Sequence, residues 1–149
     1  MQIDWVLKEF DALTPQEVYK ILQLRNAVFV VEQNCVFQDA DNNDFASSHF
    51  MGLYDNELVA YTRLVPPGLV YEQASVGRVV TAQNVRRYGV GKKLMQESIQ
   101  AVYKLYGAGP IKIGAQYYLK QFYESFGFVQ QGGIYLEDGI QHIYMLKDL

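Results

Sequence analysis

Two glycines and three basic side chains lie close together in the middle of the chain. The segment reads Arg86-Arg87-Tyr88-Gly89-Val90-Gly91-Lys92. A helical apolar periodicity begins here, so the segment would form the first turn of a helix. First-turn N–H groups lack intrahelical partners and carry the positive end of the helix dipole. Glycine permits close approach to the backbone, and the basic side chains would add charge-assisted contacts. The segment therefore predicts a phosphate-binding site.

Two nucleotide-binding motifs can be tested against this segment. A Walker loop aligned on the second glycine needs glycine at position 86 and serine or threonine at 93, where the chain has Arg86 and Lys93. A dinucleotide fingerprint starting at Gly89 needs glycine or alanine at 94, where the chain has Leu94. Both motifs fail. The alternative is that the two glycines only form a tight turn between a strand and a helix.

Strands and helices alternate around this segment. Strands are expected at 3–10, 49–54, 57–65, 73–81, 111–115, 128–131 and 142–146. Helices are expected from 14 to about 31, over 89–106 and over 117–126. The polar stretch 34–48 predicts a loop, Asp55-Asn56 a hairpin turn, and Gly77 a bulge. The unit from 73 to 115 should form a right-handed parallel crossover. This order predicts an α/β (α+β) fold with one mixed sheet.

Composition narrows the function classes. The 149 residues, half of them hydrophobic, fit one domain spanning 1–149. The formal net charge of −3 argues against nucleic-acid binding. The single cysteine, Cys35, cannot form an internal disulfide, and no stretch approaches a membrane span, so we expect a cytoplasmic protein without a membrane partner. The acidic residues at 39–44 and 137–138 would attract a cation, unless they are only solvated.

Together these features resemble the GCN5-related N-acetyltransferase (GNAT) superfamily. Its coenzyme motif is Gln or Arg, two variable residues, Gly, one variable residue, then Gly or Ala, which Arg86, Gly89 and Gly91 match. A later helix carries a tyrosine before Gly-Phe, as in the segment 122–128. Within the superfamily, the segments 24–35, 122–128 and 137–142 are similar to the ElaA-type group. The resemblance covers nearly the whole chain and implies a single GNAT-like domain, with a mixed central sheet and helices on both faces.

The resemblance also implies a cosubstrate, acetyl-CoA, and residues that bind it. The pantetheine arm would pair with the backbone of Arg78, Val79 and Val80. The pyrophosphate would be bound by Arg86, Arg87, Tyr88, Gly89, Val90, Gly91 and Lys92. Gln116, where many members have asparagine, would also contact the coenzyme, as would Phe122 and Tyr123. Tyr123 matches the family tyrosine that lies near the thioester sulfur.

Acyl transfer to an amine requires that the amine lose a proton, that donors stabilise the oxyanion and that the thiolate be protonated. Tyr123 could protonate the thiolate, and a backbone N–H near Val79 could meet the oxyanion. His142 is a candidate base because histidine titrates near neutral pH, although a histidine on an apolar strand is more often structural. Glu32 and His49 are weaker candidates on the acceptor side. No spacing of histidines and acids suggests a metal site.

The predicted function is acetyl transfer from acetyl-CoA to an amine of a small molecule or peptide. The alternative is a regulatory module that binds coenzyme A without catalysis, and a third hypothesis is an interaction domain with an empty turn. Tyr123 favours the enzyme, since a pure binder does not need its hydroxyl. Exposed edge strands would allow a homodimer, which the sequence does not decide.

Overall fold

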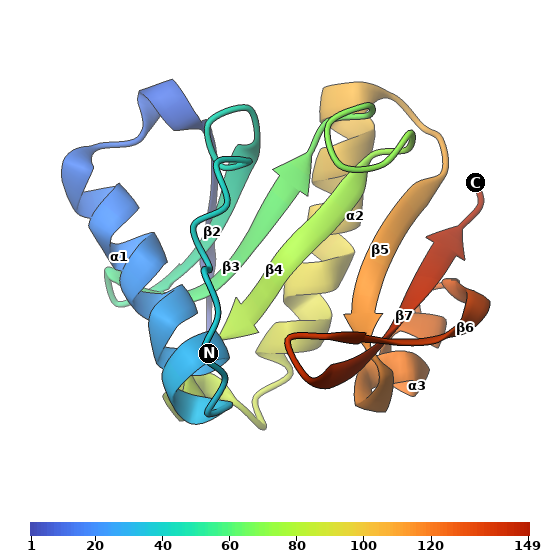
Figure 1. Ribbon diagram of the computed structural model, residues 1–149. Helices are drawn as coiled ribbons and strands as arrows, with labels where there is room; N and C mark the ends of the chain where they lie inside the picture. The colour runs from blue at the N-terminus through green and yellow to red at the C-terminus, as the bar shows by residue number, and fades with distance from the viewer.

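The computed structural model describes residues 1–149, and the first half of the chain forms an antiparallel sheet of four strands (Figure 1). They are β1 (Asp4–Glu9), β2 (Ser48–Tyr54), β3 (Glu57–Val65) and β4 (Ser75–Thr81), in that spatial order. Asp55 and Asn56 both have positive φ, 50° and 62°, as a two-residue hairpin turn requires. The predicted turn between β2 and β3 is thereby confirmed.

The second half forms a three-stranded antiparallel sheet. Its strands are β5 (Ile111–Gln116), β6 (Val129–Glu137) and β7 (Ile140–Lys147), in the spatial order β5-β7-β6. β6 continues well past the predicted 128–131, because its pairing with β7 resumes beyond a register shift between Gln131 and Tyr135. The glycine pair within this shift interrupts the apolar alternation, which is why the sequence pattern predicted a shorter strand.

The two sheets meet at one parallel bridge, between Ala74 and Ile111. There the Lys112 N–H donates to the Ala74 carbonyl at 3.0 Å. Beyond the bridge β4 and β5 diverge, and no further ladder joins them (Figure 1). The helix α2 (Val90–Tyr106) connects the two strands, as the predicted parallel crossover requires.

Helices cover both faces of the first sheet. Alternation along β3 places Ala60 and Leu64 in the larger core with α2, and Tyr61 in a smaller core with α1 (Pro15–Arg25). Thr14 and Glu17 close the predicted capping box at the start of α1, with bonds of 3.1 and 2.9 Å. The predicted α/β fold with helices on both faces is therefore present, but in place of one mixed sheet the chain has two antiparallel sheets joined by a single parallel bridge, because β4 and β5 diverge beyond it.

Two helices differ from the prediction. After Arg25, α1 passes into a π-helix, η2 (Asn26–Glu32), rather than continuing as α-helix to 31. The predicted helix over 117–126 is a 3-10 turn, η4 (Tyr117–Leu119), followed by the short α3 (Lys120–Glu124). Further 3-10 turns are η1 (Phe10–Ala12) and η3 (Gln83–Val85). No helix of the chain is both long and apolar enough to cross a membrane.

Candidate active site

A cleft of about 400 Å³ opens where β4 and β5 diverge. Its walls come from β4, β5, η2, α3 and the β6–β7 hairpin. The predicted site residues that line it are Glu32, Arg78, Val79, Val80, Arg86, Gly91, Gln116, Phe122, Tyr123 and His142. Residues widely separated in the sequence thus meet in one cleft. Of the glycine-loop residues only Arg86 and Gly91 line it; Arg87, Tyr88, Gly89, Val90 and Lys92 lie beside it in the same loop and first helical turn.

The first turn of α2 is bare. Gly89 is the N-cap in the left-handed region, with φ 74°, and no side chain caps the helix. The first helical bond runs from the Lys93 N–H to the Gly89 carbonyl at 3.2 Å, so the N–H groups of Val90, Gly91 and Lys92 have no intrahelical partner. A Cβ added at Gly89 or Gly91 would meet no atom within 4 Å. The turn therefore offers free donors in open space, which suits a pyrophosphate.

The side chain of Arg86 points to Glu32 rather than standing free. Its Nη1 and Nη2 lie 2.6 and 2.9 Å from the two Glu32 carboxylate oxygens, and Nη2 also donates to the Thr81 carbonyl at 3.1 Å. The hydrogen bonds from Arg86 lower the pKa of Glu32, so this carboxylate is ionised at neutral pH and is a weak proton acceptor. The side chains of Arg87 and Lys92 are exposed beside the loop and make no ion pair. They, rather than Arg86, are the free cations there.

A bulge interrupts β4 at the cleft. Tyr61 of β3 faces Val80 and Arg63 faces Gly77, so Arg78 and Val79 together oppose the one residue between them. Arg78 has φ 50°, in the left-handed region. The bulge thus lies one residue beyond the predicted Gly77. Because a bulge leaves its extra residue out of the ladder, backbone groups here are available to the cleft.

Tyr123 presents a free hydroxyl to the cleft. The residue is only 6% exposed, and its ring packs edge-on against Phe122 and Phe128 with centroids 5.1 and 6.1 Å apart. The hydroxyl makes no hydrogen bond to another protein group. Burial, with a smaller effect of Tyr118, raises the pKa of Tyr123, so the phenol is protonated at neutral pH. It can therefore act as a hydrogen-bond or proton donor.

The ring of His142 lies at the other wall, on β7. Its Nδ1 is 2.8 Å from the Ile140 carbonyl, which can only accept, so Nδ1 carries the proton of the neutral ring. The other nitrogen, Nε2, lies 3.4 Å from a carboxylate oxygen of Glu137. In the neutral ring Nε2 has a free lone pair, and after protonation it would pair with Glu137. This geometry leaves Nε2 able to accept a proton and places a carboxylate beside the ring that could pair with its charged form.

Gln116 faces His142 across the β5–β7 pair. Its side-chain Nε2 donates to the Gln33 Oε1 at 3.1 Å, which joins β5 to the residue that follows η2. The Gln116 amide, for which the sequence predicted a contact with the coenzyme, thus links the two walls of the cleft.

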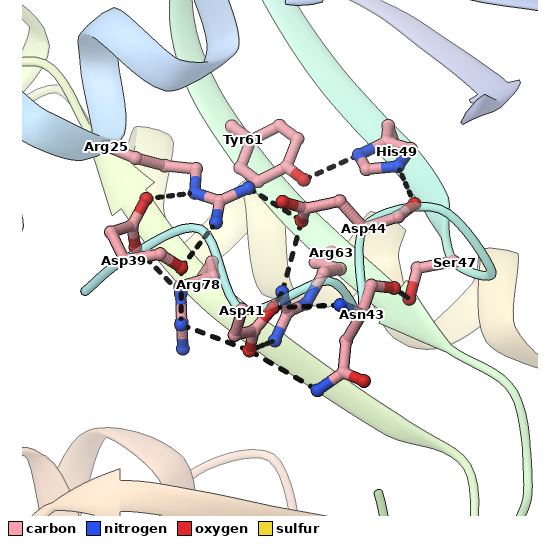
Figure 2. A network of polar contacts seen from close by, with 10 residues as sticks. All are labelled: Arg25, Asp39, Asp41, Asn43, Asp44, Ser47, His49, Tyr61, Arg63 and Arg78. Atoms are coloured by element: carbon pink, nitrogen blue, oxygen red, sulfur yellow. Dashed lines mark hydrogen bonds and ion pairs between the residues drawn. The ribbon is translucent and has the colours of Figure 1, made fainter. Parts of the chain in front are cut away.

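The residues 39–44 take part in a buried cluster on the α1 side of the sheet, shown in Figure 2, which we call the arginine–aspartate network. Its members are Arg25, Asp39, Asp41, Asp44, Arg63 and Arg78. Arg25 bonds Asp39 and Asp44 at 2.8 Å each, and Arg63 bonds both oxygens of Asp41 at 2.7 and 3.0 Å. Every carboxylate already has a guanidinium partner, so the expectation that 39–44 attracts a cationic ligand was wrong.

His49 belongs to the edge of this network and does not line the cleft. Its Nε2 donates to the Asp44 carbonyl at 2.9 Å, and its Nδ1 accepts from the Tyr61 hydroxyl at 2.7 Å (Figure 2). Burial lowers the pKa of His49, which keeps the ring neutral. Both nitrogens are thus occupied in the fold, and the structure does not bring this residue to the acceptor side as predicted.

Several cleft residues were not identified from the sequence, among them Phe37, Leu119 and Ile140. Ile140 lies two positions before His142 on β7, so the two side chains share a face, and this spacing is a signal that could have found it. Phe37 lies in an irregular loop with no periodicity. No group of three or more His, Cys, Asp or Glu side chains is arranged to hold a metal ion.

A sequence profile described as an acetyltransferase (GNAT) domain matches residues 11–149. The chain belongs to the GNAT family. Protein ElaA of Escherichia coli is 38% identical over 149 residues, which cover 99% of this chain and 97% of ElaA. The crystal structure of that ElaA aligns with a TM-score of 0.92, covering 99% of this chain and 100% of the other. This GNAT protein is therefore similar to ElaA over its full length.

Two further solved structures bear on the fold. An acyl-CoA N-acyltransferase from Pseudomonas aeruginosa is 40% identical, with a TM-score of 0.93, covering 98% of this chain and 99% of that one. A GNAT acetyltransferase from Elizabethkingia anophelis, with acetyl-CoA bound, is 17% identical with a TM-score of 0.65 and covers 99% and 98% of the two chains. The latter likeness shows the shared fold.

Proposed function

We propose that this GNAT protein transfers the acetyl group of acetyl-CoA to a primary amine of a small molecule or peptide that arrives as a cation. The observation that carries the proposal is the meeting of three features in one cleft. These are the uncapped first turn of α2, the bulged backbone of β4 and the unbonded hydroxyl of Tyr123. A protein of the same fold is known with acetyl-CoA bound, which supports the choice of donor.

Acetyl-CoA would supply the activated acetyl thioester. The free N–H groups of Val90, Gly91 and Lys92 would hold its pyrophosphate, and the exposed Arg87 would add charge. The β4 backbone near Val79 would orient the pantetheine arm and offer an N–H to the developing oxyanion. The bare turn and the bulge would thus fix the donor at its two ends.

Two side chains would carry out the proton transfers, one as a base and one as an acid. An alkyl ammonium has a pKa of about 10.4, so a base must remove a proton before the amine can attack. His142 Nε2 would accept that proton, and Glu137 would stabilise the resulting imidazolium. The N–C bond forms as the C–S bond breaks, the Tyr123 hydroxyl would give its proton to the departing sulfur, and the nitrogen would lose its second proton to solvent as the neutral amide forms. The Tyr123 phenolate then regains a proton from solvent, and His142 loses its proton to solvent.

The charges that line the cleft favour a cationic acceptor. Both arginines there are paired, Arg78 with Asp39 and Arg86 with Glu32. The carboxylates of Glu137 and Asp138 have no arginine or lysine partner. The acceptor end of the cleft is therefore net negative, which would attract an ammonium and disfavour an anion.

Thiol release tests the transfer directly. The protein is incubated with acetyl-CoA and a panel of polyamines, peptide N-terminal amines, neutral amines and anionic amines. We expect free thiol with cationic amines and a loss of turnover of about 100-fold in Tyr123→Phe, the lower range for a lost acid catalyst. Tyr106→Phe is the matched control, because that hydroxyl bonds the Leu64 carbonyl away from the cleft. Binding of acetyl-CoA without thiol release from any amine would instead identify a coenzyme-binding module.

Titration calorimetry tests the position of the donor. Gly91→Glu places a side chain and a negative charge in the cleft without backbone strain, and we expect it to abolish acetyl-CoA binding. Gly109→Glu is the control: its Cβ is equally unobstructed, but it lies outside this cleft. Unchanged binding in Gly91→Glu would contradict the assignment of the glycine turn.

A further inference from the structure

We propose that the side chain of Arg78 is a positioning residue for the acyl donor, because it holds the β4 bulge in the conformation that presents the Val79 backbone to the cleft. This inference rests on the proposed function, since it names what fixes one end of the donor site. It assigns to the arginine–aspartate network a task beyond stability.

The backbone at residue 78 is strained. Seven residues other than glycine have positive φ, and five of them are asparagine or aspartate, which tolerate this region. Arg78, with φ 50°, is not of that type, and a left-handed bulge position ordinarily takes glycine. A glycine stands directly before it, at 77, but does not adopt positive φ. Strain of this kind persists only where the surroundings fix the conformation.

The side chain of Arg78 provides that fixation. Its Nε donates to the Asp39 Oδ1 and its Nη2 to the Asp39 carbonyl, each at 2.9 Å (Figure 2). Nη2 also lies 3.3 Å from the Asp41 Oδ2. Asp39, only 5% exposed, is held from its other side by Arg25 of α1. The bulge is therefore tied through Asp39 to α1, and through Asp41 to Arg63 of β3.

The β ladder cannot supply this fixation itself. Arg78 and Val79 together oppose one residue of β3, and β5 has already diverged on the other side. With ladder pairing lost on both sides, the direction of the Val79 backbone depends on the neighbouring side chain. Arg78 is thus the link between a buried, rigid network and the backbone that would meet the pantetheine arm.

Arg78→Gly separates this role from a purely structural one, because glycine adopts the same φ without strain but lacks the side chain. The dissociation constants of acetyl-CoA and of ADP are measured by calorimetry. The ADP pyrophosphate reaches only the turn at Gly89–Gly91. We expect acetyl-CoA to bind about tenfold more weakly, the size of one or two misdirected hydrogen bonds, and ADP to bind as in the wild type. Lys8→Gln, which breaks an ion pair with Glu17 that lies outside both the network and the cleft, should leave both constants unchanged.

The outcomes are distinct. Wild-type binding of acetyl-CoA by Arg78→Gly, or an equal loss for both ligands, overturns the inference. If circular dichroism shows that this variant is unfolded, Arg78→Lys takes its place. Lysine keeps the positive charge but lacks the several N–H donors of the guanidinium group. An unchanged ratio of the two dissociation constants in Arg78→Lys would overturn the inference. Failure of the wild-type protein to bind acetyl-CoA would overturn the proposed function itself.

Discussion

The chain has two short acidic segments, at 39–44 and at 137–138, that look alike in sequence and differ in structure. The first lies in the loop before β2, where three arginines neutralise its carboxylates. The second forms the tip of the β6–β7 hairpin, where the Glu137 side chain is 60% exposed and its only ion-pair partner would be a protonated His142. Charges taken out of water require partners, whereas exposed ones do not. Burial, rather than charge count, therefore decides which acidic segment is free to meet a ligand.

The largest expected effect is on stability, at Asp44. Its carboxylate bonds Arg25 at 2.8 Å and Arg63 at 3.1 Å. Asp44→Asn would therefore remove one of the charged partners of each of these two buried arginines. We expect the free energy of unfolding, measured in urea, to fall by about 3 kcal/mol. Asp138→Asn is the matched control at the hairpin tip and should stay within about 0.5 kcal/mol. Equal losses in the two variants would contradict the contrast between the segments.

The next effect is on turnover, at Glu137. If this carboxylate binds a cationic acceptor and supports His142, Glu137→Gln should lower kcat/KM for cationic amines about tenfold, the value of one charge-assisted hydrogen bond. The midpoint of urea unfolding should not move. Glu57→Gln removes the same charge from an exposed position at the start of β3, and its kinetics should match the wild type. Activity in Glu137→Gln equal to that control would remove Glu137 from the acceptor site.

A smaller effect should appear in acid. Burial alone would raise the pKa of Asp41, but hydrogen bonds and charge from Arg63, with help from Asn43 and Arg78, lower it from 3.8 to about 2. A depressed folded-state pKa means that the carboxylate stabilises the fold above about pH 4. This contribution is lost as the pH falls from there toward about 2. Urea unfolding across this window should show stability declining with acid, and the decline should be shallower in Asp41→Asn. Identical slopes would mean that Asp41 titrates as it does in the unfolded chain.

The smallest effect is expected for the exposed pair of Glu32 and Arg86. Both side chains are about one-third exposed, at 30% and 36%, so solvent screens the pair. Glu32→Gln should lower the free energy of unfolding by less than about 1 kcal/mol, and added salt should reduce the difference further. A loss as large as that of Asp44→Asn would show that this rim pair behaves like a buried one.

Local rules predicted much of the fold. The capping box at Thr14, the hairpin turn at Asp55-Asn56 and the crossover through α2 follow from short-range chemistry. Most of the residues that the family resemblance implies for coenzyme binding line the cleft, and the exceptions lie beside it in the glycine loop and the first turn of α2. The passage of α1 into η2 was not predictable, because the apolar spacing of Val28 and Phe29 fits an α-helix equally well. The arginine–aspartate network was missed for another reason: it joins residues up to 39 positions apart, and nothing local marks such pairing.

The single parallel bridge between Ala74 and Ile111 also has a thermodynamic consequence. Past that point β4 and β5 diverge, and their facing edges lack the backbone hydrogen bonds that join the strands of a continuous sheet. An elongated molecule with amide groups, lying between the two strands, could hydrogen-bond to the backbone of both edges. Binding of the ligand would therefore stabilise the association of the two sheets. The amide hydrogens of β5, β6 and β7 would then exchange more slowly when the ligand is bound.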